Sequence, residues 1–558
     1  MIFVCFGISL YYNVIIAYIL DYIYFSLFTV LPWSYCDPEW ANNNCYVRKE
    51  GVVPCNAVNK TLFNSFGTKN STETDAVLLT HEKNVFTVPR DTYYALLHNC
   101  TNATDPATQQ FFRNRLLGLS SGVEDLGGFQ LEVLIALLLA WTCIAAVVCK
   151  GIKSSGKVVL FTSFIPFFTL GALLIRGLTL EGAGTGLYYY LVPEWKKILE
   201  PKVWQKAAEQ VFFSLSVAQG MIYSLGSYND FRNSLVRDVY IIAFADLFVS
   251  FVAGMVVFSV LGHMAHNLNV AVADVVDAGF GLAFVVYPES VTLLTWPNFW
   301  SLAFFVMLFF LALASEVSLV EGVLTPIKDE FPACQRHPTR LAFTFCAVYF
   351  FLCLPMATKG GMYVLNFLDT YIGGVLLFLL ALCEAVSLSL VYGVNRFALD
   401  CEFMMESPPG NLIKLCWKFL CPIALVIIFA AGASSYERLT FGTYVYPSWI
   451  SILAVVMVAV VFQMIPSLAL RHFIRSGKNF RQALKPLDTW GPKDPELRLK
   501  YDAFMAERGY GPQSGEKEPA GGSAEKPSPG LSETPESPVQ NVGEVQPKIE
   551  SPASETGK

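Results

Sequence analysis

Long, nearly uncharged apolar runs recur along most of this 558-residue chain. A helix that crosses a bilayer needs ~20 consecutive apolar residues, and these runs reach or approach that length. Only 15% of the residues are charged, whereas soluble domains carry about 25%. We predict an all-α, polytopic membrane protein with about ten spans, near residues 1–30, 128–149, 158–178, 206–225, 238–262, 297–325, 341–358, 362–393, 414–433 and 447–470.

Basic residues concentrate in alternate loops between these runs, for example Lys150 and Lys153 after the second and Arg471 and Arg475 after the last. Loops rich in lysine and arginine remain cytoplasmic. With an even number of spans, both termini are therefore expected in the cytoplasm of a plasma-membrane protein. The opening run lacks a basic n-region, so we interpret it as a span rather than a cleaved signal peptide.

The longest polar segment, residues 33–126, is expected to face outward. Cys36 and Cys45 lie close enough in sequence to form a short disulfide loop in an oxidising compartment. The segment also carries a cluster of N-x-S/T acceptors for glycosylation. These acceptors are Asn59, Asn70, Asn99 and Asn102.

Four boundaries follow from the change in composition along the chain. They separate a first span (1–32), the exterior segment (33–126), the remaining spans (127–475), a membrane-proximal cytoplasmic segment (476–508) and a tail (509–558). The tail is rich in Pro, Glu, Ser, Gly and Lys, a composition typical of disorder. The chain has no phosphate-binding glycine loop with its lysine, no H-E-x-x-H and no paired CxxC. We expect no enzymatic activity and no nucleic-acid partner.

A polar patch interrupts the fourth run, where residues 212–220 read FFSLSVAQG. Loosened backbone is tolerated at membrane depth only where protein encloses it or where it lines a water-filled cavity. A helix broken there would offer backbone carbonyls and a half-helix end to an ion or a solute. The alternative is that Ser and Gly mark a tight helix–helix contact.

Several stretches resemble the neurotransmitter:sodium symporter family over residues 1 to about 500. They are residues 10–13 (LYYN), 150–159 (KGIKSSGKVV), 175–180 (IRGLTL), 210–215 (QVFFSL), 227–229 (SYN), 320–323 (VEGV) and 329–332 (DEFP). The resemblance implies a LeuT-type fold of two inverted five-helix repeats plus two further helices, with alternating access around a mid-membrane site. Residue 1 would fall in the third of the family's twelve helices, so we expect counterparts of the first two to be lacking.

The resemblance also implies roles for single residues. For the substrate and its gates these are Tyr12, Phe213, Ser216, Gln219, Ser315, Glu316 and Asp369. For sodium they are Ser214, Asp246, Leu311 and Ser315, and for chloride or its substitute Gln210, Ser214, Asp246 and Ser250. Glu316 either receives a cation or turns away to bond a neighbouring helix. For Asp246, the alternative to a role in the ion site is that its carboxyl group is protonated or pairs with a group outside that site.

Asp246 stands where the family has asparagine. A fixed carboxylate could balance the charge of sodium, as chloride does in the family, because a nearby opposite charge keeps a buried acid ionised. We therefore expect Na+ as the coupling ion and weak or absent dependence on Cl−.

The function implied is sodium-coupled symport of an amino acid or a related small organic solute. The first alternative is a truncated, transport-inactive protein that associates with a full-length relative, and the second is a receptor or channel on the same scaffold. Expected partners are the lipid bilayer, the solute, and either further copies of the chain or related transporters.

Overall fold

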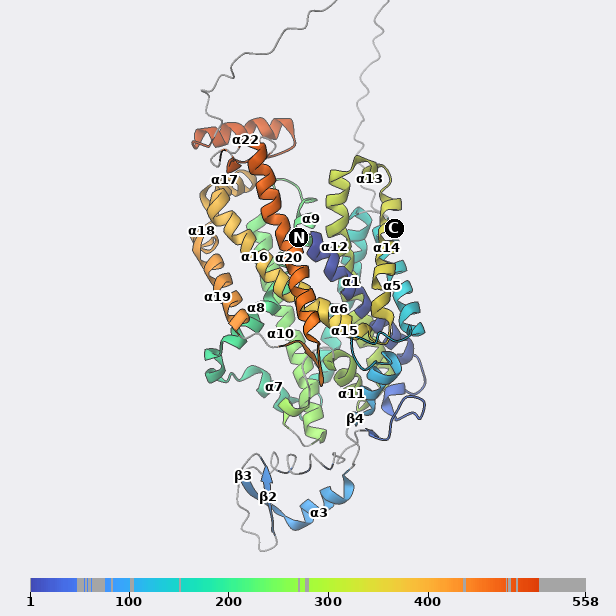
Figure 1. The fold of residues 1–558 in the computed structure, drawn as a ribbon. Coiled ribbons are helices and arrows are strands. Elements are labelled where there is room, and N and C mark those ends of the chain that lie inside the picture. Colours follow the sequence, from blue (N-terminus) through green and yellow to red (C-terminus); the bar gives the residue numbers. More distant parts are fainter. Residues whose placement is uncertain are drawn as a thin grey trace, which may run out of the picture. The chain divides into compact units, whose positions relative to one another are not determined.

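The computed structural model describes residues 2–47, 55, 58, 62, 76–81, 84–100, 105–149, 152–268, 271–275, 281–434, 438–477, 479, 483–487 and 490–510. Long helices dominate this part of the chain (Figure 1). Within these residues, eight helical segments are long and apolar enough to cross a membrane. They are Ile2–Ser26, Leu131–Val148, Leu235–Asn267, Pro297–Glu330, Pro338–Ala357, Gly361–Met405, Asn411–Ala433 and Ser448–Arg475. The predicted all-α polytopic class is confirmed.

The α-helices of the expected spans are α1 (Ile2–Ser26), α5 (Leu131–Val148), α6 (Ile152–Leu178), α8 (Pro201–Ser214), α9 (Met221–Gly226), α10 (Leu235–Leu268), α12 (Pro297–Glu330), α14 (Pro338–Cys353), α15 (Gly361–Leu368), α16 (Leu377–Val386), α18 (Asn411–Leu415), α19 (Cys421–Ser434) and α20 (Ser448–Arg475). Between and beyond them lie α3 (Arg90–Asn99), α4 (Ala107–Gln110), α7 (Ala183–Leu191), α11 (Tyr287–Thr292), α13 (Pro332–Arg336), α17 (Val394–Met405) and α22 (Pro495–Glu507).

Shorter helical segments join or extend these helices. Those of 3-10 type are η1 (Pro32–Ser34), η4 (Trp195–Leu199), η5 (Val272–Asp274) and η7 (Leu354–Ala357). Those of π type are η3 (Phe111–Leu116), η6 (Leu282–Val286), η8 (Asp369–Leu376), η9 (Ser387–Gly393) and η10 (Cys416–Leu420). Three two-stranded sheets pair β1 (Cys45–Tyr46) with β4 (Asp105–Pro106), β2 (Ala76–His81) with β3 (Asn84–Pro89), and β5 (Thr440–Phe441) with β6 (Tyr444–Val445).

Each of the ten predicted spans falls on one of these helices or helix groups. Two of them depart from a single straight helix. The segments Thr162–Leu178 and Ala183–Leu199 meet at 113°, and Gly182, the residue directly before α7, has the left-handed φ of 80° that glycine adopts without strain. The other departure is α8–α9, which is interrupted at the predicted patch.

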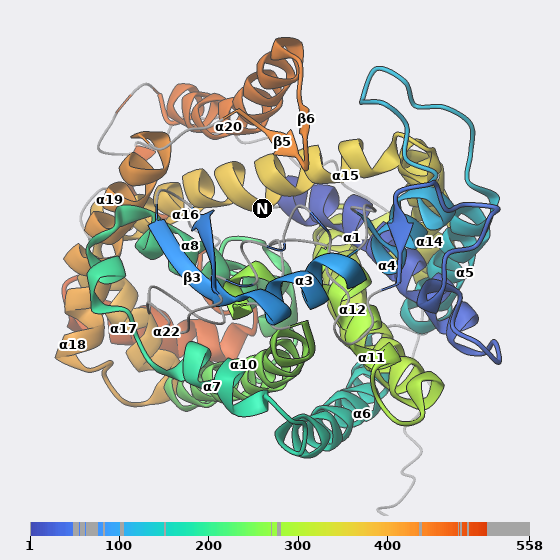
Figure 2. The ribbon, with the colours of Figure 1, turned by 90° about the horizontal axis from the view of Figure 1, so that it is seen from below.

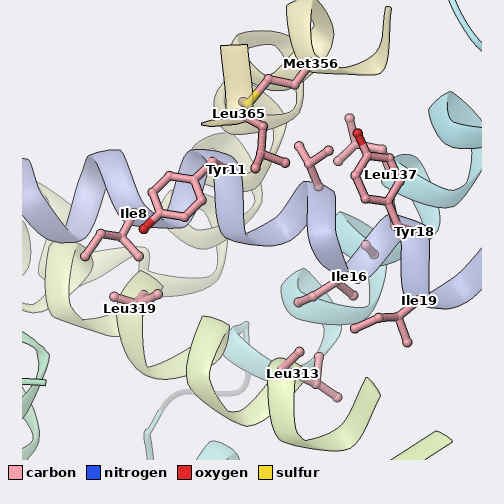
Figure 3. Close-up of a cluster of buried hydrophobic side chains, with 14 of the residues drawn as sticks. Ile8, Tyr11, Ile16, Tyr18, Ile19, Leu137, Leu313, Leu319, Met356 and Leu365 are labelled. Atoms are coloured by element: carbon pink, nitrogen blue, oxygen red, sulfur yellow. The ribbon is translucent and has the colours of Figure 1, made fainter. Parts of the chain in front are cut away.

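The core is built around α1, which packs most extensively against α12 and next against α5. Figure 2 shows α1 and α12 side by side. In Figure 3, buried side chains of α1 lie between two groups of residues. On one side are Leu313 and Leu319 of α12, and on the other are Met356 of η7 and Leu365 of α15. Because lipid tails are as apolar as leucine, close packing rather than exclusion of water holds such helices together.

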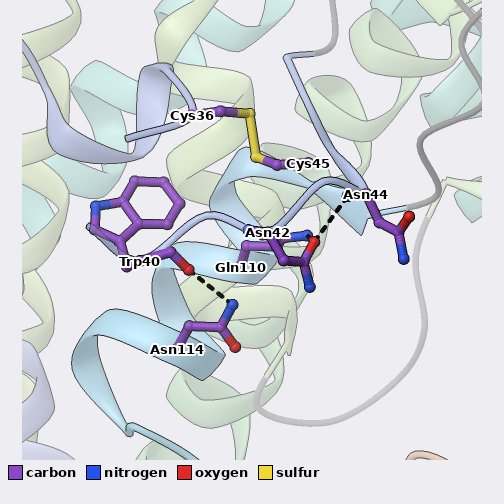
Figure 4. The surroundings of a disulfide bond; sticks show 7 residues. All are labelled: Cys36, Trp40, Asn42, Asn44, Cys45, Gln110 and Asn114. Atoms are coloured by element: carbon purple, nitrogen blue, oxygen red, sulfur yellow. Dashed lines mark hydrogen bonds between the residues drawn. A yellow bond between two sulfur atoms is a disulfide. The ribbon is translucent and has the colours of Figure 1, made fainter. Parts of the chain in front are cut away.

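The predicted disulfide between Cys36 and Cys45 is confirmed, with the two Cα atoms 6.1 Å apart. Polar side chains fix the loop that it closes (Figure 4). The Gln110 side-chain oxygen accepts from the Asn42 backbone N–H at 2.9 Å. This ties the loop to α4, whose residues are mostly buried.

A second disulfide joins Cys55 to Cys100, directly after α3. This disulfide crosslinks the two ends of the segment that contains the β2–β3 hairpin. The Cys55–Cys100 pairing was not predicted from the sequence. Asn99 is the last residue of α3. The other three predicted glycosylation sites lie outside the described residues: Asn59, Asn70 and Asn102. The predicted tail is likewise outside them from residue 511 onward.

The membrane-proximal segment after α20 folds back onto α17. The Tyr501 hydroxyl donates to Asp400 Oδ1 at 2.8 Å, and the Tyr392 hydroxyl donates to the same carboxylate. The Trp490 ring packs on Tyr392 with centroids 5.5 Å apart. Burial raises the pKa of the Tyr501 phenol to about 12, so it remains a hydrogen-bond donor at neutral pH. We call Trp490, Tyr501, Tyr392 and Asp400 the α17 cap.

Candidate ion and solute site

The interruption between α8 and α9 is a sharp break in the backbone. Helix α8 ends at Ser214 and α9 begins at Met221. Within the gap, Ser216 has φ 53°, Ala218 φ 57° and Gly220 φ 99°. A left-handed residue costs ~1–2 kcal/mol when it carries a Cβ, so a right-handed helix cannot pass through this stretch. Residues 215–220, here called the break, therefore expose backbone groups that a continuous helix would pair internally.

Helices on two sides enclose the break. The Cys5 thiol of α1 donates to the Gln219 carbonyl oxygen at 2.8 Å. On α12, a Cβ at Gly322 would lie 2.9 Å from the Cys5 sulfur and 3.2 Å from the Met221 Cα, so a larger residue there would force Cys5 and Met221 to shift. Ser216 and Gln219 are both buried. The break thus meets the condition for irregular backbone at membrane depth, since protein surrounds it.

Directly before the break, the Ser214 hydroxyl donates a hydrogen bond to the Asp246 carboxylate of α10. Gln210 precedes Ser214 by one helical turn, and Ser250 follows Asp246 by one turn. Both of these residues are exposed. The four predicted chloride-site residues thus lie on two facing helices, and the Ser214–Asp246 bond joins them.

A stripe of α1 side chains faces both the break and α12. Cys5, Ser9 and Tyr12 are spaced four and three residues apart, so they share one face of the helix. Cys5 contacts the break, the Ser9 hydroxyl donates to Glu316 Oε1, and the Tyr12 hydroxyl lies near Ser315. This stripe brings the predicted residues of α1 and α12 together.

Glu316 is fully buried, with 0% of its surface exposed. Its Oε1 is bonded by Ser9, whereas its Oε2 has no hydrogen-bond partner among the described residues. The bond to Ser9 agrees with the alternative in which Glu316 bonds a neighbouring helix, and the unpaired Oε2 leaves capacity for a further ligand.

The predicted gate residues Phe213 and Asp369 converge on Gly373. A Cβ at Gly373 would lie 2.8 Å from the Tyr11 hydroxyl, 3.5 Å from Asp369 Oδ1 and 3.9 Å from a ring carbon of Phe213. Asp369 begins the π segment η8, and such wide turns are frequent at functional sites. Tyr11 was not among the predicted residues, although it belongs to the same LYYN motif as Tyr12.

Leu311 lies in apolar surroundings. Its side chain is 47% exposed and lines an apolar cavity of about 400 Å3 bounded by α6, α10, η6, α11 and α12. The side chain faces away from polar groups, so only the backbone carbonyl of Leu311 could serve as an ion ligand. Ser315, one turn further along α12, is partly buried.

The donor set suits a hard monovalent cation. Unwound backbone carbonyls together with a hydroxyl and a carboxylate oxygen are the ligands by which broken helices hold sodium. The described residues contain no group of three or more His, Cys, Asp or Glu side chains placed to bind a metal ion. Sequence reasoning missed four polar residues of α1, namely Cys5, Ser9, Tyr11 and Asn13. The Asn13 amide is fully buried and has no partner in the described part of the chain.

Comparisons with known proteins identify the family of this chain. The family model described as "Sodium:neurotransmitter symporter family" matches residues 1–476. The sodium- and chloride-dependent glycine transporter 2 of Xenopus laevis is 36% identical over 491 residues, covering 87% of this chain and 60% of that protein. The sodium- and chloride-dependent glycine transporter 1 of Xenopus laevis is 34% identical over 506 residues, covering 89% of this chain and 76% of that protein.

Proposed function

Since this chain belongs to the sodium:neurotransmitter symporter family, we propose that it is a sodium-coupled symporter of an amino acid or a related small organic solute. The interrupted α8–α9 helix carries the proposal, because its backbone groups are freed within an apolar span and are enclosed by protein. The two relatives are both named as glycine transporters, which supports an amino acid as the solute.

In this proposal sodium binds beside Ser214 and Asp246. The hydroxyl and the carboxylate are already held together by their hydrogen bond, so less side-chain conformational entropy is lost when the ion binds. The carboxylate supplies the negative charge next to the cation. We therefore propose that the chain depends weakly or not at all on chloride, in contrast to what the names of its two relatives state.

The proposed substrate site lies between the break, α1 and α12, with the cluster around Gly373 on its outer side. Tyr11, Phe213 and Asp369 come from three different helical segments, so a relative movement of those segments would open or close the path to the site. Sodium at Ser214 would favour the outward-open arrangement, and the solute would then bridge the segments and favour closure. A ligand can shift such an equilibrium only by its difference in affinity for the two states.

Uptake measurements test this proposal directly. The full chain is reconstituted into liposomes, and accumulation of radiolabelled amino acids is measured with an inward sodium gradient and with an equal potassium gradient. We expect accumulation only with sodium. Equal accumulation under both gradients would refute sodium coupling. If no solute accumulates while the chain co-purifies with a full-length family member, the transport-inactive alternative would replace the proposal.

As a member of this family the chain is a multi-pass membrane protein. We propose that it lies in the plasma membrane with both termini in the cytoplasm, because basic residues such as Arg232 and Arg237 concentrate in alternate loops. Epitope tags at either terminus should be accessible to antibody only after cells are permeabilised. Labelling of intact cells would contradict this orientation.

A further inference from the structure

Helix α12 contains two buried acids whose environments differ. Glu321 is 2% exposed and is bonded by Lys328 of the same helix at 3.3 Å. Glu316 is completely buried, and no described basic side chain faces it. Its carboxyl group accepts a hydrogen bond from the Ser9 hydroxyl. An ionised carboxylate buried without a counter-charge is strongly destabilising. Glu321 has its counter-charge within the helix, whereas Glu316 can be ionised in its buried position only when a counter-charge arrives from elsewhere.

Glu316 occupies a position that a bound solute would reach. It follows Ser315 and is bonded by Ser9, on the same α1 face as Cys5, which contacts the break. It lies six residues before Gly322, the glycine that packs against Met221, the first residue after the break. At 1.5 Å per residue this separation is ~9 Å along α12. A solute held at the break by its polar end could therefore direct its side chain towards Glu316.

The unsatisfied groups near this position also favour a polar side chain. Glu316 Oε2 has no partner among the described residues, and neither do the oxygen and nitrogen of the fully buried Asn13 amide. Asn13 follows Ser9 by one helical turn on α1. Buried polar atoms in native proteins are generally paired. A cationic group that donates several hydrogen bonds would supply both a charge to Glu316 and donors to these acceptors.

We infer that Glu316 determines substrate specificity and that the transported solute is an amino acid with a cationic side chain. The inference rests on the proposed symport function and adds the class of solute to it. Ser9 positions the carboxylate by bonding one oxygen, and the other oxygen remains for the cation. An apolar side chain of equal length would leave that oxygen unpaired, so the site would discriminate against it.

Equilibrium binding to the purified full-length chain in sodium tests the inference. Radiolabelled lysine is the probe, and norleucine, which has the same chain without the terminal ammonium, is the competitor. Hydrogen bonds to charged groups contribute enough that we expect wild-type protein to prefer lysine on the order of 10- to 100-fold. Glu316→Gln should abolish most of this preference, and Glu316→Asp, which retains the charge, should keep part of it.

The matched control is Glu321→Gln, which removes a second buried acid from the same helix and should leave the lysine-to-norleucine ratio unchanged. Failure of wild-type protein to bind lysine, or an unchanged ratio in Glu316→Gln, would overturn the inference. A loss of preference in both glutamine variants would also overturn it, since the effect would then be a general disturbance of α12. The chain could also bind lysine in a way that requires Glu316 and yet show no sodium-driven uptake. That result would refute the proposed symport function but would support recognition of a cationic side chain by Glu316.

Discussion

If Asp246 supplies the balancing negative charge as proposed, replacing it with asparagine should make sodium binding depend on chloride. Asparagine has nearly the same shape, so the change removes the charge and keeps a side-chain oxygen for Ser214. The substitution removes the attraction between the carboxylate and the bound cation, which for unit charges ~4 Å apart is ~1 kcal/mol in water and ~4 kcal/mol at an effective dielectric constant of about 20. Ser214 is exposed and Asp246 is partly exposed, so we take a value near the lower end, ~1.5 kcal/mol, because solvent weakens such interactions.

This loss corresponds to about a tenfold reduction in apparent sodium affinity, since 1.4 kcal/mol is a factor of ten in a binding constant. The assay is sodium-dependent uptake into proteoliposomes, titrated in chloride and in gluconate. Wild-type protein should give the same sodium titration in both anions. In Asp246→Asn the titration in gluconate should shift to higher sodium by tenfold or more, and chloride should restore much of the loss.

The matched control is Asp238→Asn, which removes one charge from the same helix eight residues away, ~12 Å along its axis. Asp238 is bonded by Asn233 rather than by a residue of the proposed ion site. The control should not alter the sodium titration in either anion. Identical chloride dependence in the wild type and Asp246→Asn would refute the reasoning, because the carboxylate would then not supply the balancing charge.

Two further substitutions test the geometry of the site. Gly373→Ala places a Cβ 2.8 Å from the Tyr11 hydroxyl and should reduce uptake several-fold. Adding Tyr11→Phe removes that hydroxyl and should recover part of the lost uptake. If uptake does not recover, the contact between residue 373 and Tyr11 is contradicted. Gly220→Ala puts a Cβ on a residue with φ 99° and should destabilise the protein by ~1–2 kcal/mol in thermal unfolding. Gly171→Ala, in an open helical position, is its control and should not destabilise the protein.

The sequence predicted the positions of the spans and of the break because both depend on local composition. An apolar run of spanning length is visible without tertiary information. Ser214 and Gly220 bound a stretch of small and polar residues, and in the structure α8 ends at Ser214 and α9 begins directly after Gly220. The choice between a break and a tight helix contact needed the backbone angles, which only the folded chain provides.

The convergence of side chains from distant segments could not be predicted from the sequence alone. Motif resemblance pointed to Tyr12 as the tyrosine over the substrate, whereas the structure places the hydroxyl of the preceding Tyr11 beside Asp369. Adjacent helical residues differ by 100° in direction, so the rotation of α1 decides which one faces η8. The bond between Ser9 and Glu316 depends on the same rotation. No local signal marked Ser9, because a single serine in an apolar helix is common.

The α17 cap has a practical consequence for any shortened version of this protein. A deletion that ends at Arg475 would remove Trp490 and Tyr501 along with the tail, and would leave the Asp400 carboxylate with one phenol instead of two. Loss of function after such a deletion would then report an exposed α17 surface rather than a role of the tail itself. Shortening the chain beyond residue 510 spares these contacts and separates the two effects.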